Sequence, residues 1–164
     1  MFDDYLSWKP FFEVVALEVD DCVEISDLHG QRFPRQWSDG EFQNLVLQHN
    51  VFGFAVRQTN AFFSKPLAGF VLCREGGGEA EILTVAVAEK YGRQGLGWRL
   101  MQAALREAVS RGADTMFLEV EAANKPAADL YAKLGFRKVG ERPSYYTGAD
   151  GRRSAALVMS RVLR

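Results

Sequence analysis

Cysteine is scarce in this sequence, with Cys22 and Cys73 the only two among 164 residues. They lie far apart, without the spacing of a metal site or a redox motif, so we expect free thiols in a reducing compartment. No apolar run approaches the ~18 residues that a membrane span requires. The chain also opens with Asp3 and Asp4 rather than with the basic segment of a signal peptide. We therefore expect a cytoplasmic protein with no bound metal and no membrane partner.

An excess of charge of one sign is also missing, because 20 Lys and Arg residues face 21 Asp and Glu residues. A balance this even argues against nucleic acid as a partner. The two histidines, His29 and His49, have no partner at ligand spacing, so we interpret them as surface or local hydrogen-bonding residues. The chain length favours one domain over residues 1–164, with a short tail at 1–10.

Apolar segments and turn signals along the chain predict an α/β (α+β) fold. We expect helices from Asp20 or Asp21 to near Gly30, after the capping box at Ser38, after the glycines near position 95, and from about Asn124. Strands flanking a strand–helix–strand unit imply one mixed sheet of about seven strands, covered by helices on both faces. The expected strand ranges are 11–17, 51–57, 67–74, 79–87, 116–120, 137–142 and 155–162.

The stretch Gly95-Leu96-Gly97 joins an apolar strand to an amphipathic helix. Glycine allows a tight turn, and a helix N-terminus offers free N–H groups with partial positive charge, so this turn can bind phosphate. Arg93 and Arg99 would add charge. Taken alone, such a turn is most often only a connection. A dinucleotide fingerprint needs a third glycine where Leu100 stands, and a Walker loop needs Gly-Lys-Ser/Thr at its end. The expected buried stripe of the helix is Met101, Ala104, Leu105, Ala108 and Val109.

Four segments in this order resemble the GNAT superfamily of N-acetyltransferases, and within it the bacterial ribosomal-protein-alanine N-acetyltransferases. They are LTVAV at 83–87, YGRQGLGWRL at 91–100, FLEVEAAN at 117–124 and DLYAKLGF at 129–136. Weaker similarity extends over LHGQRFPRQWSDGEF at 28–42 and SYY at 144–146. The resemblance covers most of the chain beyond the first ~20 residues, and the ordered set is more specific than any one segment.

The resemblance implies the GNAT fold, a mostly antiparallel sheet in which a central pair of parallel strands splays apart to hold acetyl-CoA. Backbone groups of three strand residues would pair with the pantetheine arm, the glycine turn would cradle the pyrophosphate, and one asparagine would contact the cofactor. The implied residues are Val85, Ala86 and Val87; Arg93, Gln94, Gly95, Leu96, Gly97 and Trp98; and Asn124. Gly92 and Trp98 depart from the family pattern, which commonly has Gln or Arg at the first position and a basic residue at the second.

Glu119 lies within an otherwise apolar strand, and alternation places Glu121 on the same face. From the strand alone, a solvated glutamate at the strand end is the simpler interpretation, and Tyr131 by its helical spacing is typical of core. The resemblance implies that Glu119 is the general base, direct or through water, and that Tyr131 is the general acid for the thiolate. Glu121 remains a candidate partner of the substrate amine. The resemblance also implies that Tyr145 and Tyr146 wall the acceptor groove.

A protein α-amine has a pKa near 7.7–8.0, against about 10.4 for lysine, so a single glutamate suits an N-terminal acceptor better. The resemblance implies the N-terminal alanine of a small-subunit ribosomal protein, although Ser154-Ala155 replaces an acidic residue that some relatives carry. We expect a monomer or a weak dimer. Two alternatives stay open: an acetyltransferase of this fold acting on lysine or a small amine, and a non-catalytic module that senses CoA.

Overall fold

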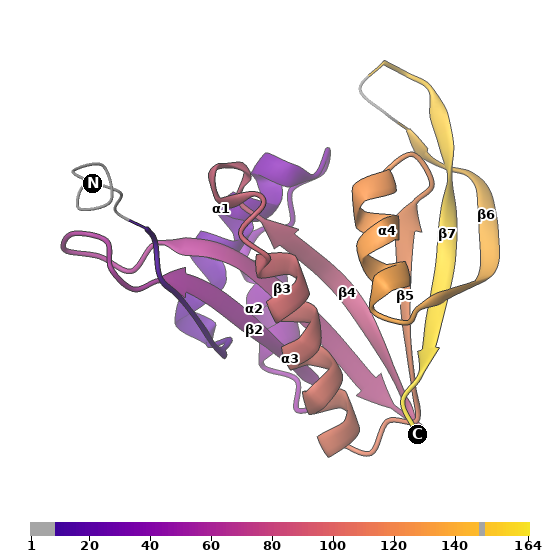
Figure 1. Ribbon diagram of the computed structural model, residues 1–164, viewed down its shortest axis with the longest axis horizontal. Coiled ribbons are helices and arrows are strands. Elements are labelled where there is room, and N and C mark those ends of the chain that lie inside the picture. Colours follow the sequence, from indigo (N-terminus) through magenta and orange to yellow (C-terminus); the bar gives the residue numbers. More distant parts are fainter. Residues whose placement is uncertain (1–8, 148–149) are drawn as a thin grey trace, which may run out of the picture.

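The computed structural model describes residues 9–147 and 150–164 and contains a sheet with the strand order β1-β2-β3-β4-β5-β7-β6. All neighbouring strands are antiparallel except β4 and β5, which are parallel. Figure 1 shows α3 and α4 in front of this sheet, with α1 and α2 behind it. The strands are β1 Phe12–Ala16, β2 Val51–Gln58, β3 Leu67–Gly76, β4 Glu79–Val87, β5 Thr115–Glu121, β6 Arg137–Thr147 and β7 Arg153–Val162. The helices are α1 Cys22–Arg32, α2 Asp39–Val46, α3 Leu96–Ser110 and α4 Lys125–Lys133.

The predicted mixed fold with helices on both faces is therefore confirmed. Two apolar clusters fill the two faces of the sheet. On the α3–α4 face, Leu100 and Met101 pack with strand residues such as Val71 and Leu118. On the α1–α2 face, Ile25 of α1 and Phe42 of α2 pack with strand residues that include Phe70 and Leu72. Of the helices in the described ranges, none is long and apolar enough to cross a membrane.

The central feature of the sheet is the separation of β4 from β5. Their parallel ladder contains the pairs Glu79–Thr115, Ala80–Met116 and Glu81–Phe117, and no later residue of β4 pairs with β5. Figure 1 shows the two strands diverging beyond this shared end. We call the opening between them the splay. It leaves one backbone edge of each strand without a strand partner among the described residues.

Local signals place several element ends correctly. The Ser38 hydroxyl accepts a hydrogen bond from the Glu41 N–H at 3.1 Å, and the Glu41 carboxylate accepts one from the Ser38 N–H at 2.7 Å. This reciprocal pair is the predicted capping box at the start of α2. The turn between β3 and β4 uses Gly77 and Gly78 at φ 62° and 83°, a conformation that favours glycine in a tight hairpin.

Three details differ from the sequence prediction. Helix α1 continues through Gly30 to Arg32 and ends before the Phe33-Pro34 step, since a residue before proline disfavours helix. Val109 is 39% exposed and therefore lies outside the buried stripe of α3. Strand β6 is longer than expected and runs to Thr147.

His29 is buried rather than on the surface. Its ring stacks on Phe33 and Trp37, with ring centroids 4.3 and 4.9 Å away, and its Nδ1 accepts a hydrogen bond from the Trp37 N–H at 3.2 Å. Burial, followed by the nearby charge of Arg35, lowers the pKa of His29 from 6.5 to about 4. The histidine therefore stays neutral in the folded protein at mildly acidic pH.

This burial predicts acid sensitivity of the fold. The unfolded chain binds a proton at His29 near pH 6.5, whereas the folded chain binds it only near pH 4, so stability is lost as pH falls through that window. We expect the free energy of unfolding in urea to drop by about 1–2 kcal/mol between pH 7 and pH 5. In His29→Gln this decrease should be smaller, and an unchanged decrease would show that other groups cause it.

Candidate active site

Strand β4 offers an unpaired backbone edge to the splay. On its other side Val85, Ala86 and Val87 pair with β3 in an antiparallel ladder. On the side of β5 no described residue pairs with them, because the parallel ladder ends at Glu81. An extended ligand with amide groups can hydrogen-bond to such an edge in the manner of an added strand.

The glycine turn leads directly into α3 beside this edge. Gly95 is the N-cap of α3 and adopts φ 72°, a left-handed conformation that glycine tolerates without strain. The N–H groups of Leu96, Gly97 and Trp98 form the first turn and have no acceptor among the described residues. A Cβ at Gly97 would lie 3.1 Å from Leu130 Cδ2, so glycine permits the close approach of α3 and α4 here. The turn is suited to binding an anion.

Arg93 and Gln94 lie exposed before this turn, and Arg93 adopts φ 62°, which is rare for a residue with a side chain. Asn124 is the N-cap of α4, and its Oδ1 accepts a hydrogen bond from the Ala127 N–H at 3.3 Å. Its side-chain NH₂ group has no partner among the described residues, so it remains available to a ligand.

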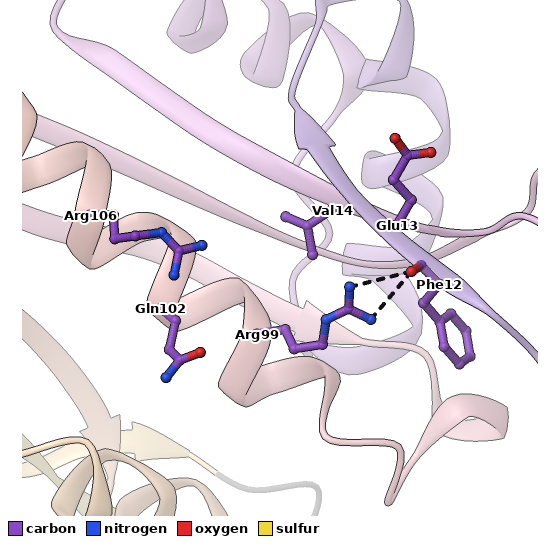
Figure 2. Close-up of a pocket in the computed structure, with 6 residues that line it drawn as sticks. All are labelled: Phe12, Glu13, Val14, Arg99, Gln102 and Arg106. Carbon is purple, nitrogen blue, oxygen red and sulfur yellow. Dashed lines mark hydrogen bonds between the residues drawn. The ribbon is translucent and has the colours of Figure 1, made fainter.

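Arg99 does not extend toward the glycine turn, contrary to the prediction that it would add charge there. Its guanidinium donates two hydrogen bonds of 3.3 Å to the Phe12 carbonyl, as Figure 2 shows. These groups border a hollow of about 290 Å³ between β1 and α3, which is also lined by Gln102 and Arg106. Neither Glu119 nor Tyr131 lines this hollow, so Arg99 and the hollow are separate from the splay.

Glu119 lies on the face of β5 that is opposite α4. Its neighbours Leu118 and Val120 are buried in the cluster on the α3–α4 face, and alternation therefore turns Glu119 toward the α1–α2 face. The side chain is 31% exposed, and its Oε1 forms a 2.9 Å ion pair with Nη2 of Arg142 on β6. The carboxylate is thus held in one direction at the mouth of the splay while it stays accessible to solvent.

Glu121 shares this face, as the sequence predicted. Its Oε1 accepts a hydrogen bond of 2.6 Å from the Ser154 hydroxyl on β7. The two carboxylates therefore have different partners, an arginine for Glu119 and a serine for Glu121.

Tyr131 of α4 lies on the other side of β5. It is 7% exposed, packs in the cluster on the α3–α4 face and contacts Phe136 edge to face, with ring centroids 6.2 Å apart. Its hydroxyl hydrogen-bonds to no described residue, and burial raises its pKa to about 12. This group therefore stays protonated at neutral pH and has its proton free for a ligand.

The structure describes only the backbone of the two predicted groove residues. The backbone of Tyr145 and Tyr146 belongs to β6 rather than to a loop, but their side chains lie outside the described residues.

The structure adds Arg142 to the candidate site, a residue that the sequence did not indicate. Arg142 is adjacent to Ala156 of β7, which in turn is adjacent to Glu121 of β5. Arg142 lies near the glutamates of β5 only because of the strand order β5-β7-β6, for which no local sequence signal exists.

The acetyltransferase (GNAT) family model matches residues 22–136. The chain belongs to this family. The GNAT fold that the resemblance of the four segments implied is thereby confirmed, and members of the family take the acetyl group from acetyl-CoA. Acetyl-CoA fits two elements described above: the edge of β4 that no described strand pairs with, and the N–H groups at the start of α3 that have no described acceptor.

Individual relatives agree with the family. The [ribosomal protein bS18]-alanine N-acetyltransferase of Haemophilus influenzae is 33% identical over 147 residues, which is 90% of this chain and 96% of that protein. Its counterpart in Escherichia coli K12 is 38% identical over 92 residues, 56% of this chain and 62% of that protein. The matched part of this GNAT protein thus spans about three fifths of the E. coli relative.

Solved structures show the same fold. The crystal structure of the ribosomal-protein-S18-alanine N-acetyltransferase from E. coli superposes with a TM-score of 0.83 and 29% identity, covering 93% of this chain and 94% of that one. Arabidopsis thaliana NAA60 in complex with acetyl-CoA has a TM-score of 0.81 at 21% identity, covering 93% and 98% of the two chains. The second likeness concerns the fold alone.

Proposed function

We propose that this chain is an N-α-acetyltransferase that moves the acetyl group of acetyl-CoA to the N-terminal amine of a protein. We base this on one arrangement. The accessible carboxylate of Glu119 and the hydroxyl of Tyr131, which has no partner among the described residues, lie on opposite faces of β5 where the sheet opens. A carboxylate and a hydroxyl so separated suit a transfer in which one face supplies the acceptor and the other the donor.

The donor would lie on the α3–α4 face. The free edge of β4 at Val85, Ala86 and Val87 would hydrogen-bond to the pantetheine arm, and the N–H groups from Arg93 to Trp98 would hold the pyrophosphate. The NH₂ group of Asn124 would donate a further hydrogen bond. Bound there, acetyl-CoA supplies a thioester carbonyl to the splay.

The acceptor amine would approach from the α1–α2 face. Glu119 would take a proton from the attacking nitrogen, directly or through a water molecule, while Arg142 keeps the carboxylate oriented. Tyr131, which burial keeps protonated at neutral pH, would give its proton to the departing thiolate. Glu121, with Tyr145 and Tyr146, would contribute to binding the acceptor.

An N-terminal α-amine fits this machinery better than a lysine side chain. At pH 7 roughly a tenth of α-amines are neutral, whereas lysine needs about 3 kcal/mol more to lose its proton. Two relatives that cover most of this chain, from Haemophilus influenzae and E. coli, carry the name of an enzyme that modifies the alanine of ribosomal protein S18. We therefore propose the N-terminal alanine of a small-subunit ribosomal protein as acceptor, which implies a cytoplasmic enzyme.

Thiol release from acetyl-CoA tests this function with two peptides. The first starts with alanine and has the N-terminal sequence of the host ribosomal protein bS18. The second has the same sequence with a blocked N-terminus and a free lysine. We expect turnover on the first peptide only. Turnover on the blocked peptide would indicate a lysine acetyltransferase. Binding of acetyl-CoA without turnover on either peptide would overturn the proposed acceptor and favour a small-amine enzyme or a sensor.

A further inference from the structure

Thr84 of β4 holds a polar atom for which the described protein supplies no partner. The residue is 7% exposed, and its Oγ1 is the one buried side-chain nitrogen or oxygen atom in the described ranges that has no hydrogen bond. Burying a hydroxyl without a partner typically costs about 1–3 kcal/mol. Valine has nearly the same shape and would avoid that cost, so packing alone gives no reason for a threonine here.

The register of β4 sets the depth at which Thr84 enters the splay. Glu81 is the last residue of β4 that pairs with β5, and it lies opposite Arg74 of β3. A bulge in the ladder between β3 and β4 leaves Leu83 without a pairing partner on β3. Thr84 therefore lies opposite Leu72, two residue pairs beyond Glu81. Without this bulge Leu83 would occupy that level.

Glu119 lies at the same level on the other strand. It follows Phe117, the last paired residue of β5, by two positions. The faces agree as well, because Leu72, the neighbour of Thr84 across the ladder, packs in the cluster on the α1–α2 face, toward which Glu119 also turns. The hydroxyl and the carboxylate therefore lie at one depth and on one face, on the two sides of the opening.

The Glu119 carboxylate and the Thr84 hydroxyl differ in their hydrogen-bond and ion-pair partners. Arg142 holds Glu119 by an ion pair, whereas Thr84 Oγ1 has no hydrogen-bond partner in the part of the chain that the structure describes. A hydroxyl both accepts and donates hydrogen bonds, and an amine offers N–H groups to accept from. An amine nitrogen placed between the two strands would satisfy the buried oxygen and would stand beside the base.

We propose that Thr84 contacts the substrate by accepting a hydrogen bond from an N–H of the acceptor amine. This rests on the function proposed above and adds a residue to its acceptor site. Thr84 orients the nitrogen so that its lone pair points through the splay at the thioester carbonyl. The nitrogen–carbon bond then forms as the carbon–sulfur bond breaks, the amine proton passes to Glu119, and the thiolate receives the proton of Tyr131.

The test compares Thr84→Val, Thr84→Ser and the matched control Thr115→Val, which changes a threonine at the closed end of the same strand pair. The readouts are thiol release with the alanine-starting peptide, the KM for each substrate, and the urea midpoint. We expect Thr84→Val to be at least as stable as the wild type and to lose about 5- to 10-fold in kcat/KM for the peptide. Its KM for acetyl-CoA should be unchanged, Thr84→Ser should recover most of the loss, and Thr115→Val should match the wild type.

The outcomes separate the two proposals. Wild-type kinetics in a stable Thr84→Val enzyme would overturn the role of Thr84 and leave the proposed function intact. A loss confined to the KM for acetyl-CoA would also overturn it, since Thr84 would then act on the donor. A wild-type enzyme that does not acetylate the peptide would overturn the proposed function first, and the contact of Thr84 with its acceptor along with it.

Discussion

Glu119→Gln is expected to lower kcat for the alanine-starting peptide by about 10²- to 10⁴-fold, the range typical for loss of a general base. Glutamine has nearly the same shape as glutamate, but its amide takes up no proton from the amine. The affinity for acetyl-CoA should hardly change, because Glu119 turns toward the α1–α2 face while the glycine turn leads into α3 on the other face. Steady-state thiol release and acetyl-CoA binding by calorimetry measure the two quantities.

The same substitution at two other glutamates, Glu141 and Glu121, provides controls for Glu119→Gln. Glu141→Gln changes an exposed residue of β6 that pairs with Lys138, with Nζ and Oε2 2.8 Å apart, and it should behave as the wild type. Glu121→Gln keeps an acceptor for the Ser154 hydroxyl. If Glu121 binds the acceptor as proposed, this change should affect mainly the KM for the peptide. A Glu119→Gln enzyme within about threefold of wild-type kcat would exclude Glu119 as the base and direct attention to Glu121.

Features with a local cause could be predicted from the sequence. The capping box at Ser38 and the tight turn at Gly95 follow from residues within a few positions of each other. Strand alternation correctly gave Glu119 and Glu121 a common face. The spacing of Tyr131 indicated a core residue, and its buried ring confirms this. The role of an acid, which the family resemblance implied, stays a prediction.

Features that depend on distant contacts could not be predicted in this way. A Cβ at Gly30 would lie 2.7 Å from Gln36 Cδ in the segment after α1. This glycine therefore lets that segment pack closely against α1, and contrary to the expectation it does not end the helix. The ion pair of Arg142 with Glu119 requires β6 to lie one strand beyond β7. The level of Thr84 depends on a bulge in the ladder with β3. Each case involves strand order, register or packing, which are properties of the assembled sheet.

Two buried tyrosines allow a role in chemistry to be distinguished from a role in stability. Tyr91 and Tyr131 are both 7% exposed. The Tyr91 hydroxyl donates a 2.6 Å hydrogen bond to Gln58 Oε1, whereas the Tyr131 hydroxyl has no described partner. The Tyr91 hydroxyl therefore contributes a buried hydrogen bond to stability, and the Tyr131 hydroxyl makes none with the described residues. Changing each tyrosine to phenylalanine should have opposite effects on stability and on kcat.

Tyr131→Phe should lower kcat by about 10²-fold or more, since the thiolate loses its proton donor, and should leave the free energy of unfolding nearly unchanged. Tyr91→Phe should do the reverse: it leaves the buried Gln58 oxygen without its donor, at a cost of about 1–3 kcal/mol, and keeps kcat near that of the wild type. Urea unfolding and thiol release with the alanine-starting peptide measure both quantities on both variants. A Tyr131→Phe enzyme with wild-type kcat would mean that water or another group protonates the thiolate, and that Tyr131 is only a core residue.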